Sequence, residues 1–504
     1  MSTLQAALVP DERTIFDWIE TVFARGVRRP GYAADRWTEN FCLERFRELG
    51  LEHVRLEPVR LPYWEPLESS MIVRADGRES RIACFSLPHS AATDGDGLDA
   101  PIIQWRDETP GAVRGALALV DVPLMRAPAD LPLMLASAVT RETDTSWRRY
   151  DPAGTLAGAN QVLPFSHQLM AVMDASIAAG AAGFVGVLSD YPGDSHRYYV
   201  PYDGVARAIP GVWINGSDGA RLRRLCGTGR VQATLVSRAI RHDITSYNVV
   251  GELPGADDDS VIVGSHHDGP WASAVEDASG VSMVLAQASY WSRIAPVDRP
   301  HRLVFLLNAG HMAGGAGVHA FIDRHRTELA RVVLEVHLEH AAIEMVERDG
   351  GLAASGHPEP RWWFTSRLAL VEASVREAIV AEQLERSMIL PPDVFGPSPT
   401  TDGGPFHLAG VPLVNFLTAP FYLFDAIDTL DKIHRPSLVP VTRAAIRIIG
   451  STHGMSAAAM RQGRGDPLYL AVRIARWIQT WARQTDNPWV RNGRGRGAAR
   501  VAAP

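Results

Sequence analysis

VIVGSHHDGPWASAVEDASG, residues 261–280, is the stretch of sequence that decides the fold. An apolar run of the kind that forms a buried strand stops at His266 and Asp268, and an acidic pair, Glu276 and Asp277, follows before Ala-Ser-Gly. Imidazole and carboxylate groups are common metal ligands. The stretch therefore predicts half of a metal site at the end of a strand.

Strands and helices alternate regularly around this stretch. The expected elements are strands at 247–253, 261–266, 302–309, 332–340 and 411–418, and helices at 280–293 and 366–384. This alternation predicts an α/β fold with a mixed, mostly parallel sheet and helices on both faces. In such sheets, sites gather at the carboxyl ends of strands, where His266, Asn308 and Glu339 lie.

A second strand pattern occupies residues 100–240. Strands are expected at 115–122, 183–191 and 231–240, and strand, turn and helix at 209–225. Residues 126–167 contain many turn residues and no clear period, so we interpret them as loops that could reach over a neighbouring site.

The composition excludes several classes of protein. Of the 504 residues, 46% are hydrophobic and 21% are charged, as in ordinary globular proteins, and the net charge of -7 gives no reason to expect nucleic acid as a partner. The three cysteines form no CxxC pair, so neither a disulfide framework nor a cysteine zinc site is expected. Neither a signal peptide nor a membrane span is expected, which predicts a cytoplasmic protein with no membrane partner. An oligomer is possible.

Several motifs occur in the order found in one known family. YNVVGELPGADDDSVIVGSHHD at 247–268, DASG at 277–280 and DAIDTLDKI at 425–433 resemble motifs of the di-zinc aminopeptidases, which include bacterial leucyl aminopeptidases, glutamate carboxypeptidase II and the glutaminyl cyclases. GALALVDV and IPGVWIN resemble the protease-associated domain that some members carry as an insert. The resemblance covers about residues 12–450 and implies a zinc exopeptidase-like fold and a metallopeptidase-like hydrolase.

The resemblance implies a domain organisation. It predicts the first part of the catalytic α/β domain at 1–99, a β-rich protease-associated insert at 100–240 and the main catalytic domain at 241–455. The strands of the insert are expected to be separate from the main sheet. A helical extension is expected at 456–490, followed by a disordered basic tail at 491–504.

The family binds two zinc ions about 3.5–4 Å apart, which share one carboxylate and activate a water. In this sequence His266 matches the first histidine ligand, and Asp268 matches the aspartate that orients it. Glu276 stands at the position of the shared aspartate, and the adjacent Asp277 could replace it. Glu339 stands at the position of a further carboxylate ligand.

Three family residues are replaced. Gly310 stands where the family has its glutamate base, and His311 stands at the next ligand position, where it could hold metal or act as the base. Phe424 occupies the position of the last histidine ligand. His337 and His340 lie near the same strand end and could equally be buried, hydrogen-bonded histidines.

The sequence therefore predicts a metal-dependent hydrolase of peptide or amide bonds with an altered site that holds at most one ion. The candidate catalytic residues are Asp268 and His311, and the candidate metal ligands are His266, Glu276, Asp277, His311 and Glu339. Zinc is the expected metal, with iron or manganese as alternatives. Two other functions are compatible with the sequence: a mononuclear metalloenzyme acting on a biosynthetic intermediate, and an inactive descendant that binds a peptide or small molecule.

Overall fold

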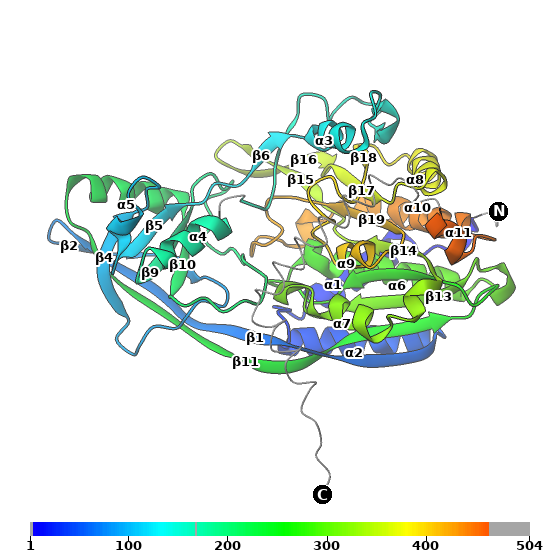
Figure 1. The fold of residues 1–504 in the computed structure, drawn as a ribbon, viewed down its shortest axis with the longest axis horizontal. Coiled ribbons are helices and arrows are strands. Elements are labelled where there is room, and N and C mark those ends of the chain that lie inside the picture. Colours follow the sequence, from blue (N-terminus) through cyan, green and yellow to red (C-terminus); the bar gives the residue numbers. More distant parts are fainter. Residues whose placement is uncertain (1–3, 167–168, 463–504) are drawn as a thin grey trace, which may run out of the picture.

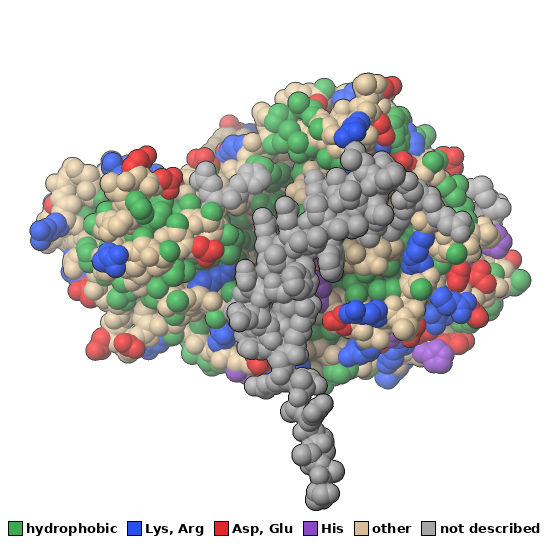
Figure 2. Space-filling view, viewed as in Figure 1, with side chains coloured by type: hydrophobic (Ala, Val, Ile, Leu, Met, Phe, Trp, Pro, Cys, Tyr) green, Lys and Arg blue, Asp and Glu red, His purple; other side chains and the backbone are tan. Residues whose placement is uncertain are grey.

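The computed structural model describes residues 4–166 and 169–462. Within these residues, no helix is long and apolar enough to cross a membrane. Of the C-terminal extension predicted at 456–490, only α11 (Ala457–Gln462) is described, and the predicted tail at 491–504 lies outside the described residues. Figure 2 shows acidic and basic side chains interspersed over the visible face, as expected from a small net charge.

One hydrogen-bonded strand order runs through the molecule: β3-β10-β9-β5-β4-β11-β13-β12-β14-β19-β17-β18-β7, with β1 beside β11 and β2 beside β1. The large lobe contains β12 (Ser260–His266), β13 (Arg302–Asn308), β14 (Val332–Leu338), β17 (Arg361–Thr365), β18 (Ser387–Leu390) and β19 (Leu413–Thr418). The small lobe contains β2 (Arg78–Ile82), β3 (Cys84–Ser86), β4 (Leu98–Gln104), β5 (Leu117–Asp121), β9 (Gly183–Leu188) and β10 (Gly211–Asn215).

Four neighbouring strands of the large lobe, β13, β12, β14 and β19, are parallel, whereas β11 and β17 border them in antiparallel orientation. This arrangement confirms the predicted mixed, mostly parallel sheet. The carboxyl ends of four strands therefore meet at one edge of the sheet. A hairpin of β15 (Ile343–Arg348) and β16 (Gly351–Pro358), which the sequence pattern did not reveal, follows β14.

Helices cover both faces of the large lobe (Figure 1). One face carries α1 (Glu12–Phe23), α2 (Ala33–Glu48), α6 (Gly280–Ser292), α8 (Ala369–Ala381) and α10 (Leu438–Ser451). The other face carries α7 (Ala316–Arg324) and α9 (Gly403–Leu408). The helix α6 has apolar residues around its circumference, which allows it to lie between the sheet and other helices. Residues 280–291 are all buried.

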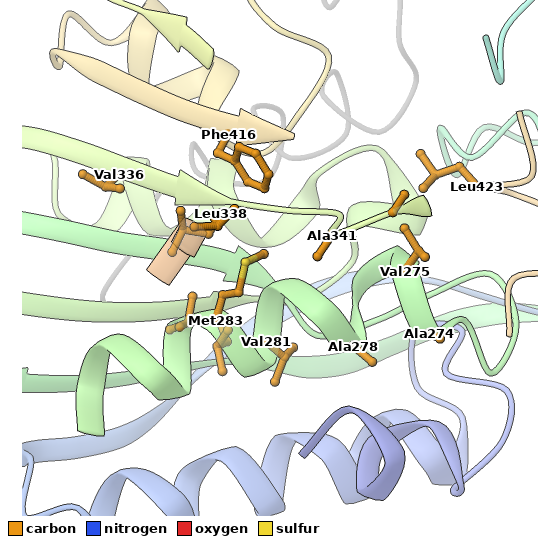
Figure 3. Close-up of a cluster of buried hydrophobic side chains, with 14 of the residues drawn as sticks. Ala274, Val275, Ala278, Val281, Met283, Val336, Leu338, Ala341, Phe416 and Leu423 are labelled. Atoms are coloured by element: carbon orange, nitrogen blue, oxygen red, sulfur yellow. The ribbon is translucent and has the colours of Figure 1, made fainter. Parts of the chain in front are cut away.

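The segment that precedes α6 is fixed by apolar packing. Figure 3 shows Val281 and Met283 of α6 in the same apolar cluster as Val336, Leu338 and Phe416 of the sheet. A distorted helical turn, Ala274–Ser279, leads into α6, and all six of its residues are buried. Packing at both ends of this turn therefore determines where its acidic pair lies.

A long antiparallel ribbon connects the two lobes (Figure 1). It consists of β1 (Glu52–Ala75) and β11 (Gln232–Leu253), which pair from Glu52↔Glu252 to Arg74↔Gln232. The strands predicted separately at 231–240 and 247–253 are therefore one strand. The predicted boundaries at 99/100 and 240/241 fall inside β4 and β11.

The small lobe has parallel strands and its own core. The strands β4, β5, β9 and β10 are parallel, with α4 (Leu169–Ala178) and α5 (Gly216–Thr228) beside them. One apolar cluster lies entirely within this lobe and the adjoining ends of the ribbon. Because β4 also pairs with β11, the expectation that these strands are separate from the main sheet is wrong. The assignment of residues 100–240 to a protease-associated domain stays a prediction.

Residues 126–162 cross from the small lobe to the large lobe and are more ordered than loops. They contain β6 (Arg126–Pro128), α3 (Leu131–Thr140), β7 (Arg149–Tyr150) and β8 (Asn160–Val162). The strand β7 adds to the edge of the main sheet by pairing with β18. Leu133 and Leu156 pack with Trp362 and Leu390 of the large lobe, and these contacts stabilise a segment that has no regular period of its own.

Candidate metal centre

The carboxyl ends of three neighbouring strands bring the candidate residues together. His266 ends β12 and pairs in register with Asn308, the last residue of β13. His311 lies in the short turn after β13, and Glu339 and His340 follow β14. All of these residues are buried, with His311 the most exposed at 7%. The sheet edge therefore collects a buried cluster of imidazoles and carboxylates.

His266 is oriented by the backbone. Its Nδ1 lies 3.0 Å from the carbonyl oxygen of Asp268, so Nδ1–H donates there and Nε2 keeps its lone pair. This Nε2 lies 3.4 Å from Oε1 of Glu276. The ring of His311 stacks on the ring of His266 with centroids 4.0 Å apart.

His311 and His340 have the same pattern. Nδ1 of His311 donates to Oδ1 of Asp402 at 2.9 Å, and Nδ1 of His340 donates to the carbonyl oxygen of Thr418 at 2.8 Å. Nε2 of His311 lies 3.8 Å from Oε1 of Glu276, and Nε2 of His340 lies 2.5 Å from Oε2. Three imidazole Nε2 atoms thus face the carboxylate of Glu276, and three oxygen acceptors hold the rings in position.

His340 reaches the cluster because the strand has ended. Neighbouring residues of a strand point to opposite faces, so His340 would point away from Glu339 if β14 continued. The strand ends at Leu338, and His340 adopts a left-handed φ of +55°. This backbone conformation places its ring beside Glu276.

The turn that carries Glu276 is held by two buried charged residues. The carboxylate of Asp428 accepts the N–H groups of Val275 and Glu276 at 2.8 and 2.9 Å. The guanidinium of Arg28 donates to the carbonyl oxygens of Ser273 and Glu276 at 2.8 and 3.3 Å. Both residues act on the backbone, so the carboxylate of Glu276 stays available to the three imidazoles.

The charges of the cluster shift its pKa values in opposite directions. Burial lowers the pKa of His266 well below 6.5, and the neighbouring imidazoles lower it further. Burial also acts to lower the pKa of His311 and His340, but nearby carboxylates outweigh it and raise these pKa values to about 10 and about 9. A metal ion that replaced the protons on His311 and His340 would therefore lie among the carboxylates that raise these pKa values.

The donor atoms fit a divalent ion. Two triads each place one ligand atom per residue within 4.8 Å of one another: His266, Glu276 and His340, and His266, His311 and Glu339. Ligands of a tetrahedral zinc at about 2.0–2.1 Å are roughly 3.3–3.4 Å apart, which matches the 3.4 Å between His266 Nε2 and Glu276 Oε1. Because one Nε2 binds one ion, triads that share His266 are alternatives for the same ion.

The carboxylates of Asp268 and Asp277 make hydrogen bonds within the protein, and each also lies 3.8 Å from a ring nitrogen of His266. The carboxylate of Asp268 accepts the N–H groups of His311 and Met312 at 3.0 and 2.8 Å, so it fixes the turn after β13, and its backbone oxygen orients His266 instead. The carboxylate of Asp277 accepts from Ser265 and from the N–H of Gly280. Asp277 belongs to neither triad, and its role as a metal ligand stays a prediction.

Gly310 and Phe424 stand where the resembling family has its glutamate base and its last histidine ligand. Gly310 adopts φ +72°, and a Cβ there would lie 2.7 Å from Cδ2 of Leu61. Phe424 is buried and packs on Tyr202 with ring centroids 4.7 Å apart, and Tyr202 stacks on His311. Neither position can supply a base or a ligand, and the packing around both leaves little room for one.

Three residues of the site were not predicted as functional. The sequence leaves His340 open between a site residue and a buried, hydrogen-bonded histidine, and the end of β14 at Leu338 is what brings it to the site. Asp402 and Asp428 contact the site from segments far away in sequence. Asp428 lies in the motif DAIDTLDKI at 425–433, but neither this motif nor the sequence around Asp402 shows which groups the two carboxylates contact.

The sheet topology and this donor set define a class: a protein with the zinc exopeptidase-like α/β fold. Residues 248–449 match the model of "Peptidase family M28". The resemblance to the di-zinc aminopeptidases is thereby confirmed.

The curated relatives align over only part of their length. Carboxypeptidase Q from Xenopus laevis is 22% identical over 349 residues, which are 66% of this chain and 65% of the relative. Carboxypeptidase Q from Bos taurus is 24% identical over 55% of this chain and 54% of the relative. The chain thus spans about two thirds or less of the length of these relatives.

Solved structures cover more of the chain. A peptidase M28 precursor from Shewanella amazonensis has a TM-score of 0.66 and 19% identity over 87% of this chain and 93% of its own. A zinc aminopeptidase from Bacillus subtilis has a TM-score of 0.60 and 19% identity over 87% of this chain and 95% of its own. At this level of identity, these likenesses establish the fold alone.

Proposed function

We propose that the chain is a metal-dependent hydrolase of peptide or other amide bonds that binds one divalent ion in an altered M28 site. The observation that carries this proposal is the convergence of three imidazole Nε2 atoms on Glu276, with each Nδ1 held by an oxygen. Histidines with this second hydrogen bond are typical of metal ligands. The match to the M28 peptidase model supports peptides as the substrate class.

The residues that would hold the ion are His266, Glu276 and His340, with His311 and Glu339 as the alternative partners of His266. A bound divalent ion supplies Lewis acidity, which polarises a carbonyl oxygen and lowers the pKa of a water. With the first set in use, Nε2 of His311 remains beside Glu276, and Asp402 holds its ring.

Activity on simple substrates is expected to be low. A general base contributes about 10²–10⁴-fold in rate, and Gly310 cannot accept a proton. His311 is the candidate replacement, but, despite its burial, nearby carboxylates raise its pKa to about 10, which keeps the imidazole protonated at neutral pH. Its ring also packs between His266 and Tyr202, so it has little freedom to move. We therefore expect little or no turnover of aminoacyl anilides.

A second candidate function follows from the donor set. Histidine and carboxylate ligands with open positions also suit iron or manganese, and the loss of the glutamate base and of the last histidine ligand removes features of the peptidase mechanism. A mononuclear metalloenzyme acting on a small biosynthetic intermediate would retain the observed ligands. An inactive protein that binds a peptide or a small molecule would not need them.

Metal content and turnover together test these proposals. The purified protein should bind one zinc per chain by plasma mass spectrometry, and His266→Ala should lose it. Two ions per chain bridged by Glu276 would contradict the one-ion site. Slow hydrolysis of dipeptides that disappears in His266→Ala would support the hydrolase, whereas a bound ion without hydrolysis of any peptide would favour the second candidate. Robust turnover by His266→Ala would place the chemistry elsewhere.

A further inference from the structure

Three ionisable side chains form a column along β14 beside the metal centre. Glu335 and His337 lie two residues apart on β14 and so share one face of the sheet, and Glu339 continues this alternation one residue past the end of the strand. Nδ1 of His337 lies 2.9 Å from Oε1 of Glu335, and Nε2 lies 2.9 Å from Oε1 of Glu339. Their exposed fractions are 0%, 0% and 1%.

The column leaves Glu339 with one free oxygen. Carboxylate oxygens accept, so His337 donates from both ring nitrogens and occupies Oε1 of Glu339. The other oxygen, Oε2, lies 3.9 Å from Nε2 of His340, on the side of the ion-binding cluster. Glu339 is therefore presented to the cluster through a single oxygen.

Two glycines provide the space for this arrangement. A Cβ at Gly264 of β12 would lie 3.0 Å from Nδ1 of His337 and 3.1 Å from Oε1 of Glu335. A Cβ at Gly403 of α9 would lie 3.2 Å from Cβ of His337. The imidazole thus has packing contacts on two sides and hydrogen bonds at both nitrogens, which together restrict its rotation.

Stability alone does not account for the column. Buried ionic groups cost desolvation free energy, and apolar replacements of similar volume are often neutral or stabilising. The neighbouring positions on the same face of β12 and β13, Ile262 and Leu306, are apolar and equally buried. A column of ions at this place therefore points to a role at the strand end.

We infer that His337 is a positioning residue that holds Glu339 through Oε1, so that only Oε2 can bind an ion. This inference rests on the proposed function with the ligand set His266, His311 and Glu339, because only this set includes Glu339. A histidine that bridges two carboxylates in this way limits Glu339 to one-oxygen coordination. It thereby favours a small ion with few ligands, such as zinc, over ions that take two oxygens from one carboxylate.

The test is a double-mutant cycle on zinc affinity. Zinc binding is measured by competition with a chromogenic chelator in wild type, His337→Gln, Glu339→Gln and the double variant. Loss of an interaction that supports a ligand typically weakens metal binding about 10–100-fold, which is the effect expected for His337→Gln. If His337 acts through Glu339, its substitution should have no further effect in the Glu339→Gln background. The visible spectrum of the cobalt form should change in His337→Gln, which a purely structural role would not cause.

Glu335→Gln is the second variant in case His337→Gln does not fold. It weakens the acceptor at Nδ1 without changing volume, and a smaller loss of zinc affinity, about threefold to tenfold, is expected. Unchanged affinity in both variants, or an equal loss in the presence and absence of Glu339, would overturn the inference and leave the one-ion site intact. Failure of the wild type to bind zinc would overturn the proposed function and this inference with it.

Discussion

The two lobes contain the same kind of structure and use it differently. Each has parallel strands with helices beside them, and each therefore has a sheet edge where carboxyl ends meet. In the small lobe, Asp121 ends β5 in an ion pair with Arg223 at the surface, and Asn215 ends β10 and caps α5. In the large lobe, the equivalent edge buries His266 and Glu339.

The difference lies in what surrounds the strand ends. The polar ends of the small lobe satisfy local needs, an ion pair and a helix N-terminus. The ends in the large lobe are enclosed by α7, α9 and the turn before α6, and distant residues such as Asp402 and Asp428 orient them. A parallel sheet therefore offers a place for a site, but chemistry requires buried groups held by a second set of residues.

The largest expected effect is from His266→Ala. It removes the residue common to both triads, so zinc affinity should fall by more than about 100-fold, and any activity should be lost with it. Chelator competition and plasma mass spectrometry measure the loss. Asn215→Ala is the matched control at a strand end of the small lobe, and it should keep full metal content. Equal metal content in the two variants would remove the distinction between the two edges.

Gly310→Glu should fail to restore the base. A side chain at φ +72° is strained, and its Cβ would also displace the end of the Leu61 side chain, so the free energy of unfolding should fall by about 1–3 kcal/mol. Urea unfolding measures this loss, and Gly310→Ala should show most of it without adding a carboxylate. A stable Gly310→Glu protein with strongly raised peptidase activity would contradict the geometry described here.

Glu359 is a buried acid of the large lobe that lies outside the metal site, and it should make the stability of the fold depend on pH. Burial raises its pKa to about 8, and its Oε1 accepts from Gln161 at 2.7 Å. Because the pKa in the folded state lies above the unfolded value, its contribution is complete below about pH 4.5 and is lost as the pH rises through 8. The free energy of unfolding should fall by roughly 1.4 kcal/mol per pH unit between these limits.

Glu359→Gln should abolish this pH dependence. Urea unfolding at pH 5.5 and 7.5 should therefore differ by about 2–3 kcal/mol more in the wild type than in the variant. Zinc affinity should be the same in both proteins, since Glu359 belongs to neither triad. Parallel pH profiles for the wild type and the variant would show that Glu359 is ionised in the folded protein.

The smallest effect is expected at the small lobe. Oδ1 of Asn215 accepts the N–H of Asp218 at 2.7 Å, so Asn215→Ala removes an N-cap and should lower the free energy of unfolding by about 1 kcal/mol. Thermal unfolding followed by circular dichroism measures the change, and Asn215→Asp should restore it. A loss of several kcal/mol would show that this strand end has a larger role than capping.

The fold was predictable because its signals are local. Apolar runs such as 261–266 and 302–309 and the helices between them specify parallel strands, and the structure has them within a few residues. The sequence predicts loops at 126–167, but residues 126–162 are ordered by contacts with Trp362 and β18, which their own sequence does not show. The strands predicted at 231–240 and 247–253 form one strand, β11, because both parts pair with the long strand β1.

The sequence by itself determined the type of fold, the family resemblance, and the positions of His266, Glu276 and Glu339 at or near strand ends. Only the tertiary structure decided which groups act together. His340 faces Glu276 where β14 ends, and Asp402 accepts a hydrogen bond from His311. Asp268 and Asp277 accept hydrogen bonds from backbone N–H groups. Spacing along a strand fixes the face on which a side chain lies, whereas hydrogen bonds between distant segments depend on how the whole chain packs.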